Sequence, residues 1–191
     1  MASGGRPRRT EVDQRLQAAV LELLHAGGPD AVTVEAVAAR SGVAKTTIYR
    51  RHENRVDLLR ATVTAAVGEP MPLLQGSVRE KIRDALRQTW GQMAKVLGPG
   101  GLAAMVAEAD PEFARLFRQT LQPFEDTLAA RIDEDARAGL LRPDTDAEAA
   151  VSLFVGAYLG ELVRRGSVDD GWLDRCLEMM WAAIAPHEGE S

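Results

Sequence analysis

The sequence predicts an all-α protein of about nine helices. Three observations predict this class. Along almost all of the 191 residues, apolar side chains recur at the three- and four-residue spacing of a helix. Stretches of Gly and Pro interrupt that pattern where one helix would end and the next begin. We find no convincing strand and no internal repeat in the sequence.

Four helices are expected in the N-terminal third. The first carries Leu16, Val20 and Leu24 on one face and ends where Gly and Pro follow at residues 27–29. Thr33 and Asn54 are N-cap candidates, because each precedes an apolar periodic segment with an acidic residue in its first turn. The predicted segments are residues 10–26, 33–40, 44–51 and 54–68.

Five further helices are expected beyond a linker marked by Pro70 and Pro72. The stretch Gly98-Pro99-Gly100-Gly101 predicts a stop between the first two of them. Asp110-Pro111 predicts a start, with Asp as N-cap and Pro in the first turn, and Pro123 predicts a kink within that helix. The five helices are expected to begin at, or to be capped by, Val78, Leu102, Asp110, Asp144 and Asp169 or Asp170.

The composition is that of an ordinary globular protein, with 46% hydrophobic and 27% charged residues, which argues against a disordered or fibrous chain. Cys176 is the single cysteine, so an internal disulfide is excluded, and three histidines leave little material for a metal cluster. We therefore predict no metal and no cofactor. No apolar run is long enough to span a membrane and none follows the basic N-terminus, so the sequence predicts a cytoplasmic protein without a membrane segment.

Charge is divided unevenly along the chain. Residues 1–60 carry ten Lys and Arg against seven Asp and Glu, whereas residues 61–191 carry thirteen against twenty-one. Arg6, Arg8 and Arg9 form a basic group at the N-terminus. This asymmetry indicates either two roles in one chain or a solvated basic face with a flexible basic tail.

Residues 33–59, TVEAVAARSGVAKTTIYRRHENRVDLL, have the layout of a helix-turn-helix. Two short helices flank a turn at Ser41-Gly42-Val43, and the second carries polar side chains that can reach phosphates and base edges in a DNA major groove. The spacing alone also fits a helical hairpin with a polar face.

The segment SGVAKTTIYRRHENRVDLL resembles the DNA-binding signature of TetR/AcrR-type transcriptional repressors. Thr47, Ile48, Tyr49, Arg55 and Leu58 match that signature in order and spacing. Further along, DPEFARLF, RAGLLRPDTDAEAA and GAYLGELVRRG resemble the C-terminal regions of tetracycline-repressor-like proteins. One departure is His52, where the family usually has Phe or Trp.

The resemblance implies a three-helix DNA-binding domain over residues 1–68, with residues 1–9 as a basic flexible arm, and an effector-binding and dimerisation domain over residues 69–191. The resemblance also implies that the partner is double-stranded DNA. The second helix of the helix-turn-helix, residues 44–51, would be the recognition helix, and the starts of its neighbouring helices would also contact the DNA. The implied DNA-binding residues are Thr33, Lys45, Thr46, Thr47, Tyr49, Arg50, Arg51 and Arg55.

The resemblance also implies a homodimer and a small-molecule effector of unknown chemistry. The last two helices are expected to form the dimer surface, where Gly156 and Gly160 permit close helix approach and apolar area comes from Trp172, Met180 and Trp181. Candidate effector-binding residues are aromatic or Met side chains, which suit an adaptable apolar cavity: Trp90, Met93, Met105, Phe113, Phe117, Phe124, Phe154 and Tyr158. The same residues also fit a plain hydrophobic core.

The function that these observations predict is a ligand-released repressor that binds a near-palindromic operator as a dimer. An activator of the same fold and a helical protein-interaction module are the alternatives. An enzyme is not expected, because no phosphate-binding loop or nucleophile–base pair occurs, and the acidic run Asp133-Glu134-Asp135 points in different directions on a helix. The operator, the regulated genes and the effector cannot be derived from the sequence.

Overall fold

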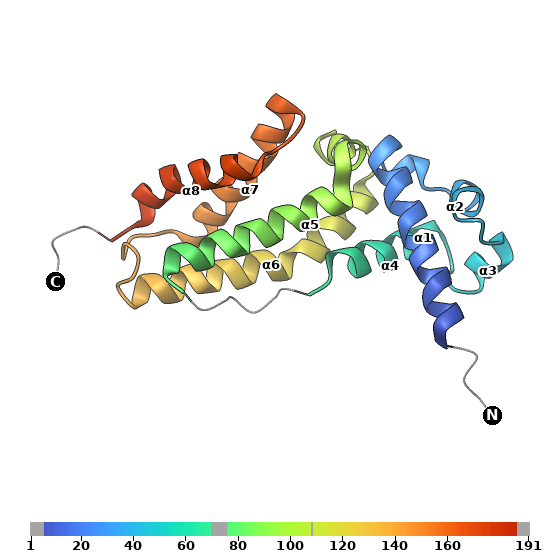
Figure 1. The fold of residues 1–191 in the computed structure, drawn as a ribbon, viewed down its shortest axis with the longest axis horizontal. Helices are drawn as coiled ribbons and strands as arrows, with labels where there is room; N and C mark the ends of the chain where they lie inside the picture. Colours follow the sequence, from blue (N-terminus) through green and yellow to red (C-terminus); the bar gives the residue numbers. More distant parts are fainter. Residues whose placement is uncertain (1–5, 70–75, 108, 187–191) are drawn as a thin grey trace. The chain divides into compact units, whose positions relative to one another are not determined.

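The computed structural model describes residues 6–69, 76–107 and 109–186, and their regular structure is helical throughout (Figure 1). The all-α prediction is confirmed. In chain order the described elements are α1 (Arg6–Gly27), the 3-10 helix η1 (Pro29–Ala31), α2 (Val34–Ser41), α3 (Lys45–Tyr49), α4 (Arg55–Val67), α5 (Val78–Val106), α6 (Pro111–Arg137), α7 (Ala147–Arg165) and α8 (Asp170–Ile184).

Two element boundaries differ from the prediction. Helix α1 begins at Arg6, so the basic segment expected to be a flexible arm is helical from Arg6 onward, while residues 1–5 lie outside the described residues. The described residues contain eight α-helices, because α5 resumes directly after a break at Gly98, where a separate helix over 102–109 was expected. Pro99 follows the break, and Pro is tolerated in the first turn of a helix.

The predicted N-caps are largely confirmed. The side chains of Thr33, Asn54 and Asp110 each accept a backbone N–H three residues further along, at 2.9 to 3.1 Å. The prediction that Asp144 caps α7 is wrong: Asp146 takes that place, because it directly precedes Ala147 and accepts the Ala149 N–H. Asp144 instead forms an ion pair with the Arg142 guanidinium at 2.8 Å.

The chain forms two compact units. One combines Met1–Gly68 with Gln92–Leu121, and the other combines Glu69–Gly91 with Gln122–Ser191. Part of α5 and the start of α6 are therefore grouped with the N-terminal helices. None of the helices in the described ranges is long and apolar enough to cross a lipid bilayer.

The core of the first unit consists of side chains that α1, α2, α3 and α4 direct toward one another. These residues are nearly or completely buried: Leu16, Val20, Leu24, Val37, Ile48, Leu58 and Val63. Their three- and four-residue spacing within each helix explains why these segments bury one face, and burial of each such side chain stabilises the fold by about 1.5–3 kcal/mol.

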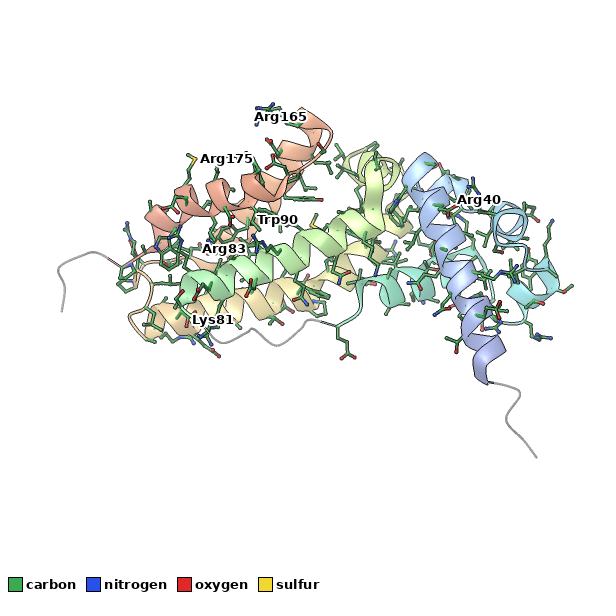
Figure 2. All side chains as sticks on the ribbon, in the orientation of Figure 1. Arg40, Lys81, Arg83, Trp90, Arg165 and Arg175 are labelled. Atoms are coloured by element: carbon green, nitrogen blue, oxygen red, sulfur yellow. The ribbon has the colours of Figure 1, made fainter. Side chains whose placement is uncertain are left out.

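The core of the second unit includes a group of aromatic rings. The indole of Trp90, on α5, has its centroid 5.2 Å from the rings of both Tyr158 and Trp172. Arg83 lies on the same helix as Trp90 (Figure 2). Its guanidinium is 3.0 Å from the Asp174 carboxylate of α8, and Arg79 pairs with Glu178. Tilted ring contacts and ion pairs thus hold the first half of α5 to α7 and α8.

A single guanidinium connects three elements of the first unit. Arg55, at the start of α4, donates to the carbonyl oxygens of Val32 at 2.9 Å and Pro29 at 2.5 Å. It also donates to the Asp110 carboxylate at 3.0 Å, immediately before α6. The planar guanidinium presents several donors in fixed directions, which lets one side chain tie η1, α4 and the start of α6 together.

These contacts alter the ionisation of Asp110. Burial alone would raise the pKa of the Asp110 carboxyl, but the Phe113 N–H and the hydrogen bond and charge of Arg55 together outweigh burial and hold the pKa below its usual value. A carboxyl with a lowered pKa in the folded state stabilises that state above its unfolded pKa, and this stabilisation is lost as the pH falls through the folded pKa.

We predict that Asp110→Asn, which keeps an N-cap but removes the charge, lowers the free energy of unfolding by about 1 kcal/mol at neutral pH. Asp110→Ala loses the cap as well and should cost about 2 kcal/mol. Urea unfolding across a pH series measures both. The difference between wild type and Asp110→Asn should be constant at neutral pH and shrink below the ordinary Asp pKa of about 3.9. A difference that persists unchanged in strong acid contradicts the ion-pair explanation.

Candidate nucleic-acid interface

The helix-turn-helix predicted from the sequence is present in the structure. Helix α2 ends at Ser41, Gly42 follows in the left-handed conformation with a φ of 66°, and α3 begins at Lys45. Val37, Val43 and Ile48 are buried, which confirms the small core expected between the two helices. The turn thereby directs the opposite face of α3 toward solvent.

Arg15 of α1 holds this turn in place. Its Nε and Nη2 atoms both donate to the Ser41 carbonyl oxygen, at 3.0 and 2.5 Å. Ser41 is the last residue of α2, where carbonyl groups have no partner within the helix and the helix dipole is negative. A cation from α1 therefore satisfies the end of α2 directly before the recognition helix.

The exposed face of α3 carries polar side chains. Lys45, Thr46 and Arg50 are exposed, and Tyr49 is 54% exposed even though it is a large aromatic residue. Thr47 is half-buried. Within the described part of the chain, Arg50 has no carboxylate at ion-pair distance, so its charge is available to an external anion.

Lys45 is exposed but has an internal partner. Its Nζ lies 2.7 Å from the Glu35 carboxylate of α2. This hydrogen bond and the lysine charge lower the pKa of Glu35. Because both side chains are more than half exposed, solvent screens the pair, and a phosphate can compete with Glu35 for the lysine.

Two of the predicted DNA-binding arginines are engaged inside the first unit. Arg51 forms an ion pair with Asp13 of α1, and only 19% of its side chain is exposed. Arg55 makes the contacts with Pro29, Val32 and Asp110 described above. The structure therefore brings Lys45, Thr46, Tyr49 and Arg50 onto the outer face of α3 and directs the other two guanidinium groups inward.

Thr33 lies at the N-terminus of α2, as predicted. Its hydroxyl accepts the Ala36 N–H at 3.1 Å, and the residue is exposed. The N-terminus of a helix presents unpaired N–H groups and the positive end of its dipole, which favours phosphate binding. Thr33 thus lies at the start of a helix next to the recognition helix, where the resemblance implies contact with DNA.

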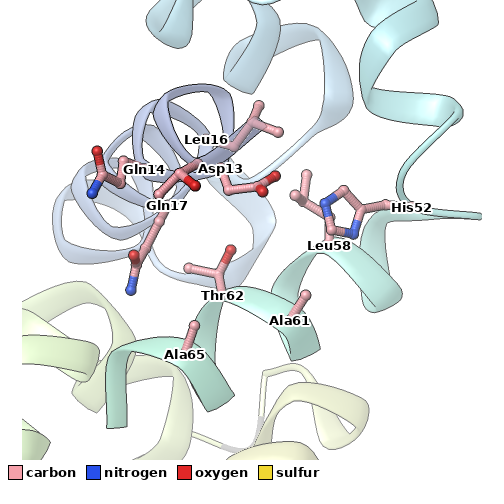
Figure 3. Close-up of a pocket in the computed structure, with 10 residues that line it drawn as sticks. Asp13, Gln14, Leu16, Gln17, His52, Leu58, Ala61, Thr62 and Ala65 are labelled. Carbon is pink, nitrogen blue, oxygen red and sulfur yellow. The ribbon is translucent and has the colours of Figure 1, made fainter. Parts of the chain in front are cut away.

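A pocket of about 320 Å³ lies between α1 and α4, beside His52 (Figure 3). Leu16 and Leu58 contribute apolar surface, and Asp13 and His52 contribute polar groups. The His52 Nδ1 atom lies 3.4 Å from the Asp57 carboxylate, so the imidazole that replaces the usual aromatic residue has a polar partner. None of the residues predicted to bind an effector lines this pocket.

The predicted effector-binding residues are divided between the two units. Met93, Met105, Phe113 and Phe117 belong to the first unit, and Trp90, Phe124, Phe154 and Tyr158 belong to the second. All except Met105 are buried. Burial raises the pKa of the Tyr158 hydroxyl. The buried Trp90 Nε1 has no hydrogen-bond partner among the described residues, which is costly for an N–H donor.

The residues predicted to form a dimer surface lie on α7 and α8 with much of their surface uncovered. Gly156 and Gly160 are exposed, with no described atom within 4 Å of where a Cβ would stand. Trp172, Met180 and Trp181 are half-buried. The sequence analysis did not include Leu153 and Val163, which are 65% and 72% exposed and line the same side of α7 as the two glycines.

The sequence analysis also missed the residues that orient the recognition helix, namely Asp13, Arg15 and Glu35. Their only signal in the sequence is opposite charge, and several arginines and carboxylates in the first sixty residues would satisfy that criterion equally well. Which carboxylate meets which guanidinium depends on the crossing of α1 with α2 and α3, which periodicity does not determine.

Comparisons with known proteins agree with this architecture. A model of the family described as bacterial regulatory proteins, tetR family, matches residues 16–62. A second model, described as tetracyclin repressor-like, C-terminal domain, matches residues 74–180, which is more than half of the chain. The first match contains the whole helix-turn-helix.

The chain is 28% identical over 179 residues to the uncharacterized HTH-type transcriptional regulator YdeS of Bacillus subtilis (strain 168), covering 88% of this chain and 87% of the relative. Among solved structures, the fold resembles the regulator FadR from Bacillus subtilis in complex with stearoyl-CoA, with a TM-score of 0.68, 18% identity and coverage of 87% and 96% of the two chains.

A transcriptional regulator from Saccharomonospora viridis in complex with choline has a TM-score of 0.70 and 18% identity, with coverage of 93% of this chain and 100% of that one. At these identities the structural likeness shows a shared fold. The family matches cover residues 16–62 and 74–180, from α1 through most of α8. The chain therefore belongs to the TetR family of bacterial transcriptional regulators, a family of DNA-binding helix-turn-helix proteins that are not enzymes.

Proposed function

We propose that this protein is a repressor that binds a near-palindromic operator in the cytoplasm as a homodimer and releases it when a small molecule binds. The observation that carries the proposal is the outer face of α3, where Thr46, Tyr49 and Arg50 are exposed on a helix-turn-helix. A single recognition helix covers few base pairs, so two copies at one or more turns of DNA are needed for specific binding.

The polar residues of α3 and the residue that caps α2 divide into two groups by their chemistry. Thr33, Thr47 and Tyr49 carry hydroxyl groups that suit phosphate oxygens, whereas Lys45, Thr46 and Arg50 suit base edges in the major groove. Arg51 and Arg55 act on DNA chiefly by orienting α3 and α4, since their guanidinium groups are bound to Asp13 and to Asp110.

The homodimer surface that we propose is the exposed strip of α7 formed by Leu153, Gly156, Gly160 and Val163, together with the apolar side chains of α8. Met179 of α8 is 80% exposed, which adds to the apolar area that a second copy would cover. Glycines at a four-residue spacing allow two helices to approach closely, and the strip has the spacing of one helix face. Residues 69–191 would then supply dimerisation, and residues 1–68 would supply DNA binding.

We propose that the effector contacts the buried aromatic residues, with Trp90 as the central one. The unpaired Trp90 N–H offers a hydrogen bond to an acceptor on the ligand, and Tyr158 and Trp172 surround its ring. Two regulators of the same fold hold stearoyl-CoA and choline, respectively, which is compatible with this class of protein binding organic ligands of different kinds. The effector shifts the equilibrium only by its difference in affinity for the DNA-binding and released conformers.

The proposed function predicts that the purified protein selects a near-palindromic sequence from genomic DNA fragments at about 150 mM salt, where non-specific phosphate binding is weak. Tyr49→Ala should lower the affinity for that sequence about tenfold, because an exposed ring and a phosphate contact are lost without disturbing the core. Tyr49→Phe is the matched control that removes only the hydroxyl. Recovery of no enriched sequence, or a Tyr49→Ala protein with unchanged selectivity, contradicts the proposal.

Glu35 is predicted to weaken DNA binding by competing for Lys45. Glu35→Gln should therefore raise the affinity and make the slope of log K against log salt steeper by about 0.9, the value for one further phosphate contact. Fluorescence anisotropy over a salt series measures both quantities. In a Lys45→Gln background the same change should leave the slope unaltered. An equal effect in both backgrounds would show that Glu35 acts only as a general negative charge.

The dimer proposal predicts that Val163→Glu converts the protein to a monomer at micromolar concentration, because a carboxylate would be buried against the second copy without a partner. Sedimentation velocity measures the change, and circular dichroism checks that the helices remain. Leu140→Glu is the matched control, since Leu140 is 49% exposed but lies outside α7 and α8. A Val163→Glu protein that sediments like wild type places the interface elsewhere.

A further inference from the structure

The break in α5 leaves a backbone carbonyl without its helical donor. Gly98 has a φ of 54° and a ψ of −175°, which interrupts the helix, and Pro99 follows it. In a continuous helix the N–H of residue 99 would donate to the carbonyl of Lys95, but proline has no N–H. The α5 helix therefore supplies no donor to the Lys95 carbonyl, which is open to a donor from another element.

His25 supplies that donor from the last turn of α1. Its Nε2 atom lies 2.8 Å from the Lys95 carbonyl oxygen, across 70 residues of sequence. Since a carbonyl oxygen only accepts, Nε2 carries the hydrogen and donates it. The contact lies within the first unit, between the helix that supports the helix-turn-helix and the part of α5 that contains the break.

The glycines of the break let the two backbones meet. A Cβ at Gly98 would lie 2.5 Å from Cγ of the His25 ring, so the ring occupies the space that a side chain would fill. A Cβ at Gly100 would lie 2.6 Å from the Gly28 nitrogen and 2.8 Å from the Leu24 carbonyl oxygen. Any larger residue at either position would force the end of α1 away from α5.

We propose that His25 is a positioning residue for operator binding: its hydrogen bond to the carbonyl left open by Pro99 fixes the direction of α1, and with it the helix-turn-helix, on α5. The inference rests on the proposed function, since the direction of α1 affects DNA affinity only when the recognition helices of two copies must reach two half-sites at one fixed spacing. The Arg15 contact to the Ser41 carbonyl passes the direction of α1 on to the turn before α3.

The test uses the near-palindromic fragment recovered by selection, rebuilt with base pairs added to or removed from between its half-sites. Wild type should bind one spacing best. His25→Ala should bind that spacing about tenfold more weakly, bind the other spacings as wild type does, and show unchanged non-specific DNA binding. His25→Gln, whose amide N–H can donate to the same carbonyl, should recover most of the preference. Lys95→Ala is the matched control, because it keeps the carbonyl that His25 uses.

A thermal melt of each variant separates a loss of folding from a loss of spacing preference. Two outcomes overturn this inference but leave the proposed function intact. In the first, His25→Ala keeps the spacing preference of wild type. In the second, His25→Ala lowers the DNA affinity equally at all spacings and on non-specific DNA. A wild type with no spacing preference overturns the dimeric operator proposal and this inference with it.

Discussion

One guanidinium group ties together the elements that flank the helix-turn-helix. Arg55 joins the carbonyls of Pro29 and Val32, which precede α2, to the carboxylate of Asp110, which caps α6. Helix α3 itself has only five residues, and a helix of that length is not stable in isolation. Its orientation must therefore come from its neighbours, and Arg55 fixes the elements on either side of the helix-turn-helix to the segment that begins α6.

The cations of the N-terminal segment consequently serve two purposes. Arg15, Arg51 and Arg55 are bound to carbonyl and carboxylate oxygens inside the unit, where they hold helices together. Lys45 and Arg50 face outward, and of these two only Lys45 has an acidic neighbour within the described ranges, through a screened pair. The net positive charge of the first sixty residues is therefore larger than the charge that α3 presents to solvent without an internal partner.

The helices of the TetR fold are joined here by features that break regular structure. Gly98 and Pro99 interrupt α5, and the carbonyl that the interruption exposes is satisfied by His25 of α1. In the other unit the rings of Trp90, Tyr158 and Trp172 pack together while the Trp90 N–H stays without a partner among the described residues. The core of the second unit thus keeps an unsatisfied donor at Trp90, whereas the carbonyl at the break in the first unit has its donor.

The sequence by itself determined the all-α class, the helix-turn-helix and the caps at Thr33, Asn54 and Asp110, because periodicity, turn chemistry and capping act over a few residues. The same local reasoning placed the α7 cap at Asp144 instead of Asp146 and separated the two halves of α5, since several candidates satisfied the same short-range rule. Only the tertiary structure decided which charges are bound internally and that His25 meets the Lys95 carbonyl. Such contacts depend on the angle at which helices cross, and that angle is set by packing of whole faces rather than by the spacing of residues along any one helix.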